Sequence, residues 1–171
     1  SNQTIGIAAL TSAGLLLVAV VDADGMEVGA HTSSANFPGV STLKVEFDSS
    51  NRLVVAGTLG TGTTKIARSI SAANGDDLVF GTGGVVTKSA FLLSNIFMRE
   101  DSKITLIGTQ AAKLTAVWYQ ADGTADPAFN SGAELLVVAG TAVDAAYDSN
   151  GKLVIAGQLN NNFVLARLNV D

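Results

Sequence analysis

The sequence predicts an all-β domain made of four repeated units, and three observations support this prediction. Short runs of Val, Ile, Leu and Thr are bounded by Gly, Asn, Asp and Ser, which is the pattern of strands and tight turns. One run recurs as "IGIAA", "LVVAG", "ITLIG" and "LVIAG", and successive copies begin 48, 51 and 49 residues apart. A turn motif, "ADG" or "ANG", recurs at nearly the same interval.

These repeats divide one domain, residues 1–171, into four units, of which the first and last are incomplete. The units cover residues 4–39, 40–87, 88–138 and 139–171.

The first unit predicts three strands, over residues 4–9, 15–21 and 26–31. The second unit predicts four strands, over residues 40–47, 52–58, 63–70 and 77–87. Asp, Asn and Gly in the connections "DSSN" and "AANG" suit tight turns because these residues tolerate positive φ. The third unit predicts four strands by the same pattern, and the fourth predicts three.

Four strands in a unit of about 50 residues are typical of a β-propeller blade. The predicted fold is therefore propeller-like, with about four blade-type repeats. By this alignment the first unit lacks its innermost strand and the fourth lacks its outermost strand. We therefore expect a partial propeller, completed by other chain segments or by oligomerisation.

Composition and charge exclude several classes of partner. The chain is 47% hydrophobic and 15% charged, and its net charge is -5. Nucleic acids and anionic membrane surfaces attract clustered Lys and Arg, which are scattered here, so neither partner is expected. The longest apolar run, "LLLVAVV" at residues 15–21, is too short to insert across a membrane. The absence of cysteine excludes disulfides and thiolate metal sites.

Several motifs carry a resemblance to one repeat family. They are "DSNGKLVIAG" (148–157), "FVLARLN" (163–169), "ADGTADPAFNSGA" (121–133) and "LVFGTGGVVT" (78–87). These motifs resemble the delta-60 repeats, which occur in tandem in large bacterial proteins. The resemblance covers roughly residues 40–171. In the first unit Ala9 replaces the usual Gly, and no Asp-x-x-Phe follows the turn.

The resemblance implies propeller-like arrays in secreted or cell-surface proteins, so an extracellular or cell-surface location is expected. It supplies no catalytic residues.

Few residues suggest metal or catalytic chemistry. Asp22 and Asp24 could begin a calcium loop, but two carboxylates are too few and a turn is favoured. Asn74 occupies the equivalent turn of the second unit. His31 is the only histidine, lies in a polar segment and is expected to be solvated. We therefore predict no metal, no cofactor and no catalytic residue.

One repeated strand position has variable chemistry. It holds Arg68 in the second unit, Trp118 in the third and Arg167 in the fourth. An arginine at such a position commonly pairs with a turn carboxylate. Alternatively, Trp118 and Tyr119, together with one of the arginines, line a blade edge that recognises a sugar or a peptide. These four residues are the predicted ligand-binding residues.

Two classes of function remain. The first is a non-catalytic repeat module of a bacterial secreted or surface protein, acting as a scaffold or in adhesion and ligand binding. Its expected partners are a carbohydrate or protein ligand and further copies that associate through open blade edges. The alternative is a propeller-type lyase or glycosidase with a site in the central channel, for which the innermost strands offer Glu46, Asn95 and Asp144.

Overall fold

A computed structural model describes residues 4–71 and 75–169 of the chain. Within these residues the strands form four antiparallel sheets of three, four, four and three members. The prediction of an all-β fold is confirmed. No helix of the described residues is long and apolar enough to cross a membrane. Asn74 lies outside the described residues.

The elements have the following bounds. Sheet 1 contains β1 (Thr4–Leu10), β2 (Leu15–Asp22) and β3 (Glu27–Asn36). Sheet 2 contains β4 (Val40–Phe47), β5 (Leu53–Leu59), β6 (Thr64–Arg68) and β7 (Val85–Lys88). Sheet 3 contains β8 (Leu92–Met98), β9 (Ile104–Gln110), β10 (Lys113–Tyr119) and β11 (Leu135–Ala139), and a short 3-10 helix, η1 (Asn130–Gly132), precedes β11. Sheet 4 contains β12 (Thr141–Tyr147), β13 (Leu153–Leu159) and β14 (Asn162–Leu168).

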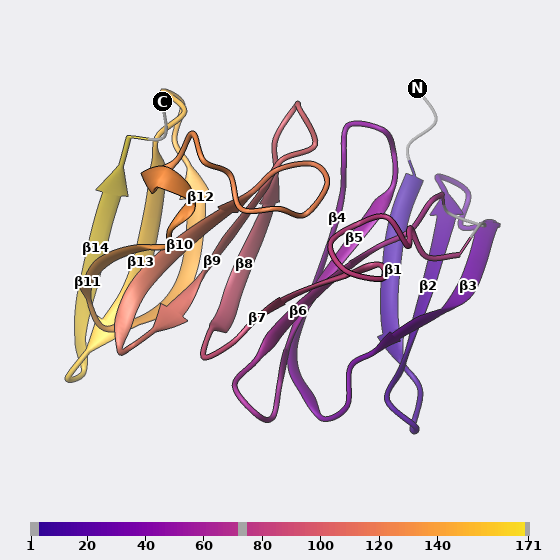
Figure 1. The fold of residues 1–171 in the computed structure, drawn as a ribbon, viewed down its shortest axis with the longest axis horizontal. Helices are drawn as coiled ribbons and strands as arrows, with labels where there is room; N and C mark the ends of the chain where they lie inside the picture. Colours follow the sequence, from indigo (N-terminus) through magenta and orange to yellow (C-terminus); the bar gives the residue numbers. More distant parts are fainter. Residues whose placement is uncertain (1–3, 72–74, 170–171) are drawn as a thin grey trace.

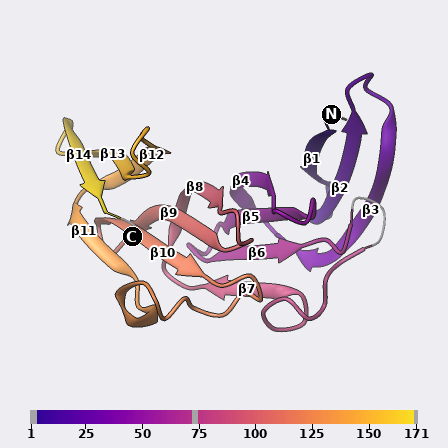
Figure 2. The ribbon, with the colours of Figure 1, turned by 90° about the horizontal axis from the view of Figure 1, so that it is seen from above.

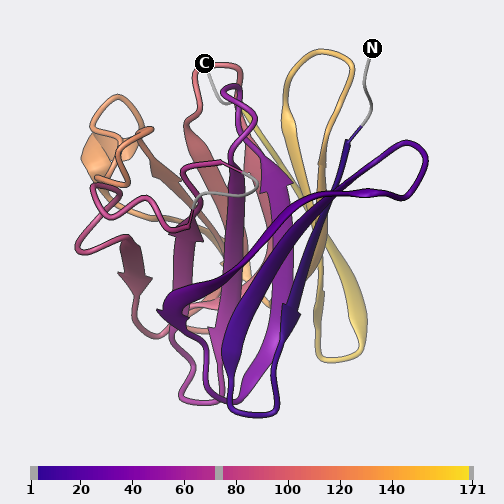
Figure 3. The ribbon, with the colours of Figure 1, turned by 90° about the vertical axis from the view of Figure 1, so that its right-hand side faces the viewer.

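The four sheets stand side by side in chain order (Figure 1). Seen from above they follow an arc, with β1, β4, β8 and β12 on its concave side (Figure 2). Along this side β1 contacts β4, β4 contacts β8, and β8 contacts β12. Figure 3 looks onto the sheet 1 end of the arc and shows sheet 1 nearest the viewer.

A separate hydrophobic core fills each gap between neighbouring sheets. Leu16 and Val18 of sheet 1 pack with Leu53 and Val55 of sheet 2. The opposite face of sheet 2 packs against sheet 3, and the opposite face of sheet 3 packs against sheet 4. Strand β5 is therefore buried on both faces along its whole length. Burying one Leu or Ile side chain stabilises a fold by roughly 1.5–3 kcal/mol, so these cores hold the arc together.

Two predicted strands differ from the observed ones. The predicted strand 77–87 begins only at Val85, because the preceding segment turns repeatedly and Gly81, Gly83 and Gly84 all have positive φ. The predicted strand 26–31 extends to Asn36, because β2 and β3 stay paired as far as Leu15 and Asn36.

The glycine of the repeated "LVVAG"-type run lies at or next to an irregularity in the strand beside it. Gly108 and Gly157 lie opposite register shifts in β8 and β12, and Gly57 is one residue from the position opposite the shift in β4. A Cβ atom on any of them would lie 3.0 Å or less from a backbone carbonyl oxygen of that strand. In sheet 1 the equivalent strand, β1, is itself the first strand and pairs only with β2, so Ala9 fits there.

This contact predicts which glycine substitutions are costly. Replacing Gly108 by Ala should lower the free energy of unfolding by about 1–3 kcal/mol, since the new methyl group meets the Leu92 carbonyl oxygen and the Phe91 ring. The matched change Ala9→Gly should cost less than about 1 kcal/mol, the entropic cost of glycine in a strand. Urea unfolding of both variants measures the difference, and equal losses would contradict the explanation.

Candidate ligand-binding groove

Aspartate side chains stabilise several of the hairpin turns at one end of the strands. The Asp48 carboxylate accepts hydrogen bonds from the backbone amides of Ser50 and Arg52, both at 2.9 Å. The Asp148 carboxylate accepts the equivalent bonds from the amides of Asn150 and Lys152, at 2.8 and 3.0 Å. One carboxylate thus satisfies two turn amides that would otherwise need water.

Asp22 makes the same arrangement in sheet 1. Its Oδ1 atom accepts from the amides of Asp24 and Met26, at 3.0 and 2.9 Å. This is the turn that the sequence favoured over a calcium loop. Within residues 4–71 and 75–169, no group of three or more His, Asp or Glu side chains could hold a metal ion.

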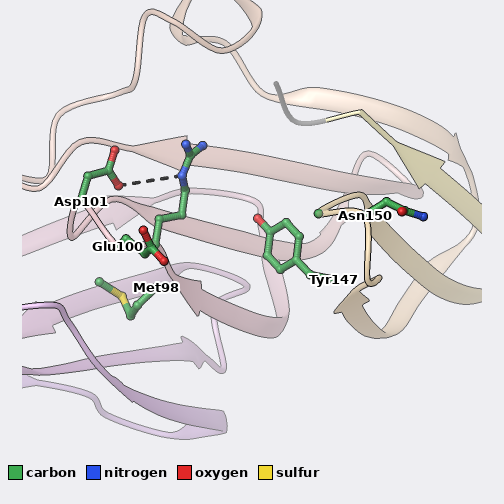
Figure 4. A pocket seen from close by; sticks show the side chains of 7 residues that line it. Met98, Glu100, Asp101, Tyr147 and Asn150 are labelled. Atoms are coloured by element: carbon green, nitrogen blue, oxygen red, sulfur yellow. Dashed lines mark ion pairs between the residues drawn. The ribbon is translucent and has the colours of Figure 1, made fainter.

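An open groove of about 700 Å³ lies between the turn that joins β8 to β9 and the turn that joins β12 to β13. The side chains that line it and matter for its chemistry are Met98, Arg99, Glu100, Asp101, Tyr147 and Asn150. Figure 4 shows Asp101 and Asn150 on opposite sides of the Tyr147 ring. The groove therefore combines an aromatic ring with charged groups on one side of it and an amide group on the other.

Tyr147 is held in place by its neighbours. Its ring packs edge-on against Phe97, with 5.1 Å between the ring centroids. Its hydroxyl lies 3.4 Å from the Thr105 hydroxyl. Arg99 and Asp101 form an ion pair at 3.9 Å, and both side chains are exposed. An aromatic ring fixed beside exposed hydrogen-bonding groups is the arrangement that binds sugar rings or peptide side chains.

The sequence pattern did not indicate this groove. The charged turn "REDSK" (99–103) and Tyr147 are far apart in the chain, and only the packing of sheet 3 on sheet 4 brings them together.

The predicted ligand-binding residues Arg68 and Trp118 have packing roles instead. Both side chains are buried. The Arg68 guanidinium lies 4.6 Å from the centroid of the Phe80 ring, and Trp118 stacks on Phe129. Phe80 and Phe129 occupy equivalent places. The backbone amide of each donates to the backbone carbonyl oxygen of the aspartate three residues earlier, and the amide of that aspartate donates to the carbonyl oxygen of Arg68 or Trp118. The exposed edge expected from these residues is therefore not formed.

The other two predicted residues lie apart from each other. Tyr119 is buried, and burial together with the nearby charge of Glu134 raises its pKa to about 12. Arg167 is half-exposed and pairs with Asp148. Hydrogen bonds from the Lys152 backbone, and further bonds from Asn150 and Arg167, hold the pKa of Asp148 below its ordinary value despite some desolvation. Arg167 alone among the four offers an accessible charge.

The repeated Asp-x-x-Phe loop is the signal that could have located these side chains. Asp77 and Phe80 in sheet 2 match Asp126 and Phe129 in sheet 3. The Asp77 carboxylate accepts from Arg68 at 2.7 and 3.0 Å. The loop therefore folds back on the residue at the end of the third strand and buries it.

His31 is placed differently from the prediction of a solvated loop residue. It lies within β3, and only 10% of its side chain is exposed. Its Nε2 atom lies 3.6 Å from Asp76, and neither ring nitrogen has a hydrogen-bond partner. The carboxylate of Asp76 also accepts from the amide and the hydroxyl of Ser34, both at 2.6 Å.

Two of the three polar residues predicted on the inner strands, Asn95 and Asp144, make a structural contact. The Asn95 side chain donates to Asp144 at 3.0 Å and to the Ala145 carbonyl at 3.2 Å, and so links sheet 3 to sheet 4. Partial burial raises the pKa of Glu46. Asn95 and Asp144 therefore meet, but as an amide and a carboxylate, not as an acid and base pair.

Comparisons with known proteins give a structural similarity and no function. No protein-family model and no curated protein matches the chain. A crystal structure of a protein of unknown function from Bacteroides caccae is similar, with 15% sequence identity and a TM-score of 0.49. The similarity covers 95% of this chain and 60% of that chain, so the chain spans less than two thirds of that protein's length.

The buried position of Arg68 predicts a large effect when its partner is removed. Replacing Asp77 by Ala should lower the free energy of unfolding by about 3–5 kcal/mol, because the Arg68 charge would remain buried without its carboxylate. Replacing Arg99 by Ala, which breaks an exposed ion pair, should cost less than about 1 kcal/mol. Urea unfolding measures both, and a small loss for Asp77→Ala would show that Arg68 escapes to solvent.

The environment of Asp76 predicts a pH-dependent stability. Burial of the carboxyl opposes ionisation, but hydrogen bonds from Ser33 and Ser34 and the charge of His31 outweigh it, so the pKa of Asp76 is lowered. A lowered folded-state pKa stabilises the fold above the unfolded value of about 4, and this contribution is lost as the pH falls through the folded pKa. The Asp76→Asn variant should therefore lose less stability on acidification below about pH 4 than the parent chain.

Urea unfolding measured between about pH 5 and pH 2 tests this expectation. Ser34→Ala removes one of the two hydrogen bonds from Ser34 to the carboxylate and should give an intermediate slope. Identical slopes for the parent chain and Asp76→Asn would mean that this carboxyl contributes nothing to acid sensitivity.

Proposed function

We propose that the chain is a non-catalytic, β-propeller-type repeat module that acts as a rigid scaffold and presents a ligand-binding groove at one end. The observation that carries this proposal is the face-to-face packing of four antiparallel sheets around an arc, with their first strands on the concave side (Figure 2). Radial sheets that each pack on the next one are the architecture of propeller blades.

The connectivity of the sheets supports the same proposal. In each sheet the strands follow one another in chain order, from the concave side outward. Each sheet then passes directly to the first strand of the next, as from Lys88 to Leu92. The resemblance to delta-60 repeats favours a bacterial secreted or cell-surface protein as the setting for this module.

The packing suits a scaffold. Strands β5 and β9 are buried along nearly their whole length, and the aspartate-closed turns need no outside partner. A groove built on such elements is largely formed before a ligand arrives, which reduces the entropic cost of binding. Its mixture of Tyr147 with Arg99, Asp101 and Asn150 suits a carbohydrate or a polar peptide segment.

The lyase or glycosidase alternative receives less support. Retaining and inverting glycosidases place two carboxyl groups on either side of the bond that is cleaved. Here the Asp144 carboxylate is bonded to the Asn95 amide, and this pair joins two sheets. The groove at the turns is instead a site for recognition.

A glycan and peptide array followed by titration calorimetry tests the groove. We expect binding by the parent chain and a loss of affinity of at least about tenfold in the double variant Arg99→Ala/Asn150→Ala, because two polar contacts are removed. Lys113→Ala, at an exposed position at the start of β10 outside the groove, is the matched control and should bind normally. No detectable binding on either array, or equal affinity in the double variant and the parent chain, would contradict ligand binding at the groove.

A further inference from the structure

The two end sheets of the arc each have one uncovered apolar face. On sheet 1 this face includes Ile5 and Ile7, whose side chains are 58% and 44% exposed. On sheet 4 it includes Phe163 and Leu165, which are 73% and 58% exposed. In Figure 3 no other described strand stands in front of sheet 1. Large apolar surfaces of this kind are rare on monomeric proteins and mark interaction sites.

The uncovered face of sheet 1 is equivalent to a face that is covered in sheet 2. Ile7 pairs with Ala19 across β1 and β2 just as Val55 pairs with Ala67 across β5 and β6. Ile5 has the position of Leu53 by the same register. In sheet 2 these side chains pack against sheet 1, and Leu53 and Val55 are only 1% and 2% exposed.

The uncovered face of sheet 4 is equivalent to the opposite face of sheet 2. Ala156 pairs with Leu165 across β13 and β14 just as Ala56 pairs with Ile66 across β5 and β6. Val154 likewise has the position of Val54. In sheet 2 these side chains pack against sheet 3, and Val54, Ala56 and Ile66 are completely buried.

From this equivalence we propose that a second copy of the chain covers both faces, with sheet 4 of one copy packed on sheet 1 of the other. The two faces are the two halves of the interface that already joins neighbouring sheets inside the chain. Leu165 of one copy would share a core with Ile5 and Ile7 of the other, as Ile66 shares a core with Ile104 and Leu106 within the chain. The inference does not depend on a ligand in the groove.

A polar contact supports the same pairing independently of the apolar faces. Inside the chain, Arg68 of sheet 2 donates to the carbonyl oxygen of Ala121 in the "ADG" turn of sheet 3. Sheet 1 has the same turn, because Asp22, Gly25 and Met26 make the same backbone bonds there as Gln120, Gly123 and Thr124 make in sheet 3.

That turn leaves Ala23 exposed at the position of Ala121. Arg167, at the position of Arg68, is 50% exposed. We therefore expect the Arg167 guanidinium of one copy to reach the Ala23 carbonyl of the other.

The geometry favours a closed pair. Figure 2 shows that the arc opens on one side, with sheets 1 and 4 at its two arms. A head-to-tail interface either closes into a ring or grows into a filament, depending on the rotation between copies. Two arcs facing each other use the interface twice and leave neither face uncovered.

Sedimentation equilibrium of the 171-residue chain tests the proposal. At roughly 100 µM, where a complex with a micromolar Kd is almost fully formed, we expect twice the chain mass of 17.4 kDa. A single species at 17.4 kDa would overturn the proposal and leave the faces to further sheets of a longer chain. A ladder of larger species would overturn the closed pair.

Charged substitutions on each face identify the contact. Ile7→Glu and Leu165→Glu should each give a monomer, because every interface of the pair uses one face of each kind. Val79→Glu, at an 84% exposed position in the loop before β7, is the matched control and should remain a dimer. If either variant unfolds, as judged by circular dichroism, Ile5→Glu and Phe163→Glu replace them, since both side chains are more exposed.

Mixing the two monomeric variants separates head-to-tail from like-to-like packing. Ile7→Glu keeps an intact sheet 4 face and Leu165→Glu keeps an intact sheet 1 face, so the mixture should form a heterodimer through one interface. Dimers that persist in either variant alone, or a mixture that stays monomeric, would overturn the pairing. Arg167→Gln should weaken the parent dimer by about tenfold, and an unchanged Kd would remove the contact to Ala23.

Discussion

The structure depends on one packing constraint, which is that each sheet must bury both of its faces against neighbours. An antiparallel sheet with apolar residues on both faces that is packed on one side only would leave the other face in water. Sheets 2 and 3 meet the constraint within the chain, and their central strands β5 and β9 are accordingly buried at successive positions instead of alternating ones. Sheets 1 and 4 meet it on one side only.

A second constraint is the limited space at two places, between the backbones of the first two strands of a sheet and at the outer part of each core. The glycines opposite the irregular first strands permit close backbone approach, and the Asp-x-x-Phe loops cover the outer part of the cores. In sheet 2 that loop supplies a carboxylate and an aromatic ring for Arg68, whereas in sheet 3 it supplies a ring for Trp118. The same backbone therefore accepts a cation or an indole at one position.

The sequence allowed the all-β class, the strand number of each unit and the turns at Asp22 and Asp48 to be predicted, because these follow from local pattern and turn chemistry. The burial of Arg68, Trp118 and Tyr119 was not predicted, because it depends on a loop that folds back after the strand has ended. The burial of His31 was not predicted for a related reason, since it depends on Asp76, which lies far from it in the sequence. The groove around Tyr147 depends on packing between sheets and has no local signal.

The aspartate-closed turns have a consequence for how such a surface can change. In each of them a single carboxylate fixes the backbone, so side chains inside the turn, such as Ser50 in one and Ser149 and Asn150 in another, are not needed to hold the hairpin. These positions can therefore exchange freely between polar, charged and aromatic residues while the strands stay in register. The side chains of these turns can therefore vary while the backbone of the strands and turns stays the same, which suits them to grafting a new binding specificity.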